Sequence, residues 1–196
     1  MNRSTLLVAG LISLFAASAH AQSAAAAQDR VTPHFKVQIW GETFVDFNTR
    51  LEAFSALRRE LESGLPPLVT TDSPADIRKA VRVRAKRIRA ARSNAREGDI
   101  FTPPISDSFR RALVEDLDLA TCTAIMEDNP GEFAHHINGS HPEEEPRSTV
   151  PPHILAALPR LPDDVQYRFV GRHLVLLDTR SGVILDRIPF AIPCTE

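Results

Sequence analysis

The spacing of apolar residues changes along this chain, from intervals of three and four before Cys122 to alternation near the C-terminus. Intervals of three and four place side chains on one face of an α-helix, whereas alternation places them on one face of a β-strand. A helical half followed by a strand-rich half is typical of the α+β class, in which helices cover an antiparallel sheet. We therefore expect an α+β fold.

Three amphipathic helices are predicted in the first half. Apolar residues recur from Trp40 to Leu61, with Arg58 on the solvent side of the stripe. Ser73-Pro74 and Thr102-Pro103 each combine a capping hydroxyl with a proline at the first helical position. The predicted helices span residues 42–63, 74–97 and 103–119.

The second half predicts a small sheet. Alternating residues in 165–188 indicate a three-stranded antiparallel meander, in which Asp178 and Asp186 are interpreted as turn residues. Pro151-Pro152 opens a short helical turn, and the preceding segment, rich in proline and acid, is expected to be a long loop with one short strand near 133–138. The expected organisation is a signal peptide (1–21), a flexible tether (22–34) and one domain (35–196) with a helical part (35–122), a loop (123–150) and a meander part (151–196).

The N-terminus has the features of a secretory signal. Arg3 precedes an apolar run over residues 6–17, and Ala19-His20-Ala21 matches a small-x-small cleavage site. We expect cleavage after Ala21 and a periplasmic or secreted protein. No later apolar stretch approaches the roughly 18 residues of a membrane span, so an integral membrane protein is not expected.

Two cysteines occur in the chain, Cys122 and Cys194. An exported protein with two cysteines most simply forms one structural disulfide, and a pair of buried free thiols is the alternative. The chain has no C-x-x-C motif, so redox catalysis is not expected.

The second predicted helix is strongly basic. Nine Lys or Arg residues lie between Ile77 and Arg96, with no acid among them. Such a helix can bind an anionic envelope surface or an acidic protein, whereas nucleic acid is not expected outside the cytoplasm. A solvated face, partly paired with acids of the third helix, is the alternative. The candidate binding residues are Lys79, Arg82, Arg84, Lys86, Arg89 and Arg92.

Arg84 and Arg92 fall within or at the edge of the apolar face of that helix. A buried arginine usually meets a carboxylate, because an unpaired buried charge is costly. The expected partners are Asp99, Asp116 and Asp118. Alternatively, the two arginines form an anion-binding pocket, or the polar cluster of an unrecognised hydrolase.

The loop before the meander contains possible metal ligands. Imidazole and carboxylate groups bind zinc, nickel or copper, and a solvated polar loop is the alternative. The candidates are Glu132, His135, His136 and His141. Motifs of serine hydrolases, zinc proteases and nucleotide-binding loops are absent from the sequence, so we expect a non-catalytic protein without a cofactor.

Several stretches resemble an uncharacterised family of small exported bacterial proteins, over roughly residues 45–190. They are Ile88-Arg89-Ala90-Ala91-Arg92, Gly98-Asp99-Ile100-Phe101-Thr102-Pro103, Phe109-Arg110-Arg111, Leu158-Pro159-Arg160-Leu161-Pro162, Tyr167-Arg168-Phe169-Val170-Gly171-Arg172 and Leu174–Asp178. The meander is also similar to the end of periplasmic nickel and cobalt homeostasis proteins. The family resemblance implies no particular activity. The signal peptide, the basic helix and the lack of catalytic motifs favour an exported binding or envelope-support protein. Alternatively, the histidine loop and the similarity of the meander favour a periplasmic metal-handling or stress-response protein.

Overall fold

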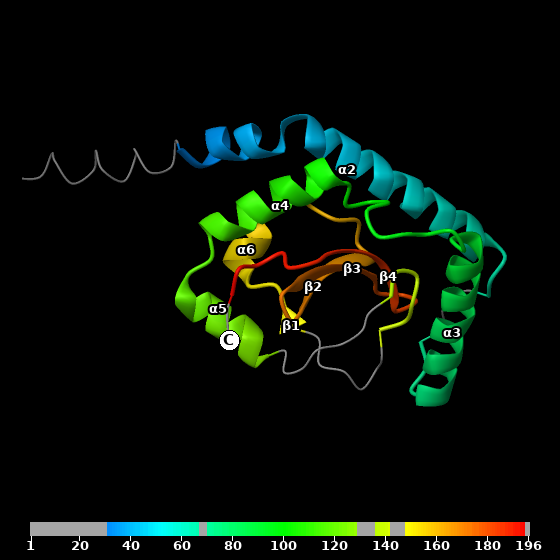
Figure 1. Ribbon diagram of the computed structural model, residues 1–196. Helices are drawn as coiled ribbons and strands as arrows, with labels where there is room; N and C mark the ends of the chain where they lie inside the picture. The colour runs from blue at the N-terminus through cyan, green and yellow to red at the C-terminus, as the bar shows by residue number, and fades with distance from the viewer. Residues whose placement is uncertain (1–30, 67–69, 129–135, 142–147, 195–196) are drawn as a thin grey trace, which may run out of the picture. The chain divides into compact units, whose positions relative to one another are not determined.

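The computed structural model describes residues 31–66, 70–128, 136–141 and 148–194. The chain divides after Val37, and the described residues before that point are helical. The unit that begins at Gln38 combines helices with a four-stranded antiparallel sheet, which confirms the α+β class (Figure 1).

Helix α2 (Val31–Ser63) is interrupted at Gly41, whose backbone is not helical (φ 31°, ψ −127°). Positive φ is easy for glycine because it has no Cβ, so the chain can change direction here. Beyond Gly41 the helix predicted over 42–63 is confirmed. It buries Phe47, Leu51 and Phe54 in the main core.

Helix α3 (Pro74–Ala91) begins as predicted, with Ser73 as its cap and Pro74 at its first position. Its predicted end at residue 97 is wrong. The side-chain amide of Asn138 donates hydrogen bonds to the carbonyls of Arg89 and Arg92, at 3.0 and 2.9 Å. A residue far along the chain therefore satisfies carbonyls that a longer helix would have paired internally.

Helix α4 (Pro103–Glu115) also ends before its predicted limit of 119. A separate helix, α5 (Leu119–Glu127), starts after Asp118, whose carboxylate accepts a hydrogen bond from the Thr121 backbone N–H at 2.7 Å. Because the backbone of an N-cap residue is not helical, Asp118 cannot cap α5 and also continue α4. The helical part therefore extends to Glu127, four residues beyond the predicted start of the loop at 123.

The sheet has the strand order β1-β2-β3-β4, and every neighbouring pair is antiparallel. The predicted meander is confirmed as β2 (Val165–Val170), β3 (His173–Asp178) and β4 (Val183–Ile188). The short strand β1 (Ser148–Thr149) adds to the free edge of β2, opposite Phe169 and Arg168. The expected helical turn after Pro151 is α6 (Pro152–Ala157).

The main core lies between the sheet and the helices. The ring of Phe109 in α4 contacts those of Trp40, Phe47, Phe101 and Tyr167, with centroids 4.8–5.7 Å apart. Figure 1 shows α2 and α4 side by side over the sheet, running in opposite directions. One aromatic side chain thus joins two helices to strand β2.

The other face of the sheet has a smaller apolar cluster, to which Ile137 of the segment 136–141 contributes. Ser140 forms a β-bridge with Val183, and the Ile184 N–H donates to the Gly139 carbonyl at 2.9 Å. The strand expected near 133–138 lies partly outside the described residues, and its described part is a turn.

Cys122 of α5 and Cys194 form a disulfide, as predicted from the two-cysteine count. Their Cα atoms are 5.5 Å apart and 72 residues separate them in sequence. Cys194 is buried in the main core and Cys122 packs against it, so the bond ties the end of the helical half to the C-terminal segment.

Candidate functional site

Helix α3 presents several exposed basic side chains. Ala85 and Ile88 face the core, and Figure 1 shows α3 near the end of β4. Five basic side chains of α3 are exposed. We call them the α3 basic face, and they are Arg78, Lys79, Arg82, Lys86 and Arg87.

Within the described part of the chain, no acidic side chain pairs with the centre of this face. No carboxylate in that part of the chain lies within 4.0 Å of Lys79, Arg82 or Lys86. The acids expected to pair with it lie on or after α4, where Asp107 instead pairs with Arg110 at 3.2 Å. Like charges that repel each other on one helix attract an anionic partner strongly.

A groove of about 670 Å³ runs along the first half of α3. Its lining combines basic side chains, among them Lys79 and Arg180, with apolar ones such as Val81. Ile77 and Val83, both on its wall, are 50% and 40% exposed. The apolar face that the sequence predicts for α3 is therefore buried only in the C-terminal half of the helix.

Arg89 and Arg92 have contacts within the fold, and so does Arg87 of the α3 basic face, which donates from Nη1 to the Leu61 carbonyl at 2.8 Å. Arg89 donates from Nη1 to the Ser140 hydroxyl at 2.5 Å, and Arg92 donates from Nη2 to the Leu185 carbonyl at 2.9 Å. The Arg92 guanidinium also lies 5.6 Å from the centre of the Phe54 ring. Burial lowers the pKa of Arg92, although the nearby carboxylates of Asp186 and Asp99 oppose that shift. All three arginines therefore have structural contacts.

Arg84 is buried, as its position in the stripe predicts, but its expected partners are wrong. Its Nε lies 3.6 Å from Oε1 of Glu62 on α2, and not beside Asp99, Asp116 or Asp118. Arg84 and Arg92 are eight residues apart on the helix axis, about 12 Å. Arg84 and Arg92 therefore contact different partners and do not form one polar cluster.

A partly buried ion-pair network, which the sequence did not predict, lies beside Arg84. Arg180 bridges Glu62 and Asp164, at 3.3 and 3.6 Å. Arg58 joins Asp164 at 3.0 Å and Asp178 at 3.1 Å. The predicted solvent position of Arg58 is wrong, because acids from distant elements supply its charge partners inside the fold.

Asp186 is the second buried carboxylate of the meander. It accepts backbone hydrogen bonds from Gly98, Ile100 and Phe101 in the connection between α3 and α4, at 2.7–3.0 Å, and from Arg187 at 2.8 Å. Burial raises the pKa of Asp186, and the hydrogen bonds from these N–H groups oppose that rise. Its interpretation as a turn residue is wrong, since the carboxylate organises a connection on the other half of the chain.

The metal candidates are only partly described. Glu132 and His135 lie outside the described residues, His136 is exposed and His141 is buried. In the described ranges, no three His, Cys, Asp or Glu side chains are grouped as a metal site requires.

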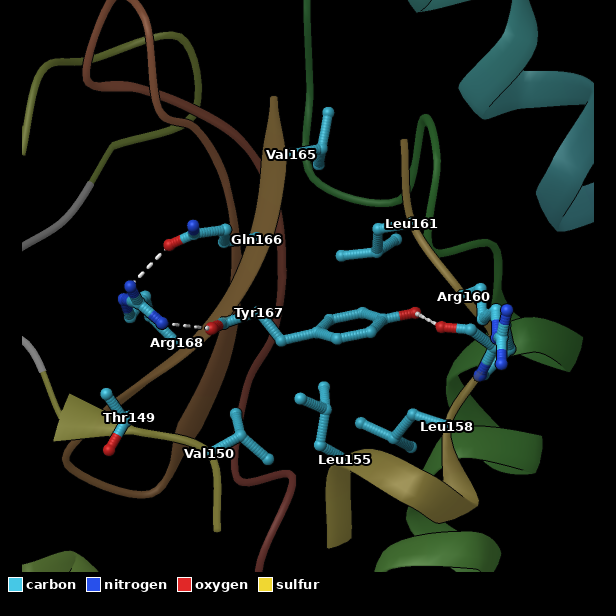
Figure 2. Close-up of a pocket in the computed structure, with 11 residues that line it drawn as sticks. Thr149, Val150, Leu155, Leu158, Arg160, Leu161, Val165, Gln166, Tyr167 and Arg168 are labelled. Atoms are coloured by element: carbon cyan, nitrogen blue, oxygen red, sulfur yellow. Dashed lines mark hydrogen bonds between the residues drawn. The ribbon is translucent and has the colours of Figure 1, made fainter. Parts of the chain in front are cut away.

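A second hollow lies at the edge of β2, and Figure 2 shows its lining. It has a volume of about 430 Å³ and is bounded by β2, the end of β1, α6 and the segment 158–161. We call it the β2-edge pocket. Sequence reasoning identified its strand and helical turn, but not the space between them.

The ring of Tyr167 crosses this pocket (Figure 2). It lies between Leu161 on one side and Leu155 and Leu158 on the other, and its hydroxyl donates to the Pro159 carbonyl at 3.1 Å. Burial raises the pKa of Tyr167 well above its usual value, so the phenol is neutral at physiological pH. The floor of the pocket is therefore apolar and uncharged.

None of the helices in the described part of the chain is long and apolar enough to cross a membrane. No match to a protein-family model, to a curated protein or to a solved structure is found for this chain.

Proposed function

We propose that this is an exported, non-catalytic protein that binds an anionic envelope surface through the α3 basic face. The observation that supports the binding role is that no carboxylate of the described residues lies within 4.0 Å of Lys79, Arg82 or Lys86 on that face. Exposed basic side chains on one rigid helix provide electrostatic attraction, while the exposed Ile77 and Val83 add apolar contact beside them.

Export is supported by the N-terminal pattern and by the disulfide. Arg3, the apolar run over 6–17 and Ala19-His20-Ala21 together have the order of a secretory signal. Structural disulfides persist mainly in oxidising compartments such as the periplasm. Mass spectrometry of the exported fraction tests this part, because the mature chain is expected to begin at Gln22.

Retention on anionic vesicles tests the binding part. We expect retention to fall steeply between low and physiological salt, because exposed charges are screened over about 8–10 Å in that range. Replacement of Lys79, Arg82 and Lys86 by Gln should abolish retention and leave stability unchanged, since all three side chains are exposed. Arg89 is kept, because it bonds to Ser140.

A matched control separates the α3 basic face from net charge. Arg59, Arg96 and Arg111 are exposed and lie outside α3, so their replacement by Gln removes the same charge. This variant should be retained like the wild type. Equal loss in both triple variants would show a net-charge effect and would contradict the proposal.

The alternative role in metal handling or stress response stays a prediction, because Glu132 and His135 lie outside the described residues. The resemblance to exported bacterial proteins stays a prediction as well.

A further inference from the structure

The β2-edge pocket has the composition of a small-molecule site. Its volume of about 430 Å³ falls in the range of ligand pockets, roughly 300–1,000 Å³. Most of its lining is aliphatic, with Val150, Leu155, Leu158, Leu161 and Val165 around the Tyr167 ring. Leu155 is 49% exposed, so a large apolar side chain is left in contact with water at the pocket wall.

The charged side chains among the described lining residues are both arginines, Arg160 and Arg168. Figure 2 shows Arg160 beyond the hydroxyl end of the Tyr167 ring, whereas Arg168 lies on the other side of the β2 backbone. Arg160 is therefore the charge that a ligand beside the Tyr167 ring would meet, and a positive charge there favours an anion over a cation.

The two arginines differ in their hydrogen bonds. Arg168 donates to the Gln166 side chain and, at 3.2 Å, to the Tyr167 carbonyl. Arg160 is exposed, and no carboxylate of the described residues lies within 4.0 Å of it. Its planar guanidinium can therefore receive a carboxylate through two parallel hydrogen bonds.

The middle of the pocket offers a ligand little polar contact. The Tyr167 hydroxyl already donates to Pro159, and the neighbouring side chains are aliphatic. A ligand with polar groups along its length would lose hydrogen bonds to water on entering. An unbranched hydrocarbon chain loses none, and it gains from the burial of apolar surface.

We propose that the β2-edge pocket binds a linear alkyl carboxylate, with the chain against Leu155, Leu158 and Leu161 and the carboxylate at Arg160. This site is separate from the α3 basic face, which the proposed function uses.

Calorimetric titration with dodecanoate, at concentrations where it is monomeric, tests the proposal. Dodecanoate should bind at one site, and dodecyltrimethylammonium, which has the same chain and the opposite charge, should bind at least tenfold more weakly. Arg160→Gln should weaken dodecanoate binding about three- to fivefold, the usual effect of one exposed ion pair. Arg160→Lys should recover part of that loss, because it keeps the charge but not the paired hydrogen bonds.

A second pair of variants tests the apolar wall. Leu155→Glu places a carboxylate where the chain should lie and should weaken binding more than tenfold. Leu119→Glu is the matched control, because Leu119 is 83% exposed on α5 and does not line the pocket. It should bind dodecanoate like the wild type.

The dodecanoate titration and the vesicle experiment test separate sites, so one can fail while the other succeeds. The triple Gln variant of Lys79, Arg82 and Lys86 should bind dodecanoate normally, whatever its retention on vesicles. Equal binding of the two amphiphiles, or wild-type affinity in both Arg160→Gln and Leu155→Glu, would overturn the proposal.

Discussion

Arg58 and Asp178 form an ion pair inside the fold, with 3.1 Å between Nη1 and Oδ1 and a fully buried carboxylate. The pair joins α2 to the end of β3 across 120 residues of sequence. Asp178 also accepts hydrogen bonds from the backbone and hydroxyl of Ser181, so one carboxylate both closes the last hairpin and holds it to a helix.

Replacement of Arg58 by Met should lower the free energy of unfolding by about 3–5 kcal/mol, because it leaves the Asp178 charge buried without its partner. Urea denaturation measures the loss. Arg59→Met is the control, since Arg59 is exposed on the same helix and should change stability by less than about 0.5 kcal/mol. A similar small loss in both variants would contradict a structural role for the pair.

Loss of the Cys122–Cys194 disulfide should also be costly. A loop closed over 72 residues stabilises by about 4 kcal/mol in the chain-entropy model. Cys194→Ser should therefore lower the melting temperature, and addition of a reductant should have the same effect on the wild type. Thiol labelling of the denatured, unreduced protein should find no free cysteine. Two labelled thiols would refute the bond.

Tyr167 predicts a loss of stability at alkaline pH. Burial raises the pKa of the folded phenol well above 10.0, whereas the unfolded phenol ionises near that value. As pH rises above 10.0, only the unfolded chain loses the proton, so the wild type should lose stability relative to Tyr167→Phe. The chain has one tyrosine, so tyrosinate absorbance reports this residue alone. Ionisation near pH 10 in the folded protein would disprove the prediction.

Asp186→Asn should destabilise the fold by about 2–4 kcal/mol. Two backbone N–H groups donate to each carboxylate oxygen, and an amide would place its own NH₂ against one of those pairs. Asp163→Asn is a suitable control, because Asp163 is exposed. Chemical denaturation of both variants gives the comparison, and equal stability would rule out this role for Asp186.

Local patterns predicted the main helices and the three strands of the meander, but not α5 or β1. The spacing from Trp40 to Leu61 predicted a helix, and the alternation over 165–188 predicted three strands, because both patterns depend on neighbours in sequence. The helix limits were less accurate. Asp118 was an available capping signal that reasoning from the apolar spacing missed. No feature of α3 itself could reveal that Asn138 would bond to the carbonyls at its C-terminal end.

Charged residues were the main source of error. The apolar spacing around Arg58 predicts a solvent position for it, and Arg84 was expected to pair with acids that follow α3 in sequence. Their partners, Asp178 and Glu62, come from elements whose positions are known only once the chain has folded. The β2-edge pocket was missed for the same reason, since a hollow between two elements has no signature in either one.

Asp186 makes the α3–α4 connection depend on strand β4. The amides of Gly98, Ile100 and Phe101 belong to the helical half in sequence, yet their acceptor lies 85–88 residues away. In hydrogen-exchange measurements, these N–H groups should exchange at the same rate as those of β4. They should not exchange at the faster rate of the frayed end of α3. The basic helix is thus positioned in part by the last hairpin of the chain, and a substitution at Asp186 should displace the α3 basic face, although Asp186 is not part of that face.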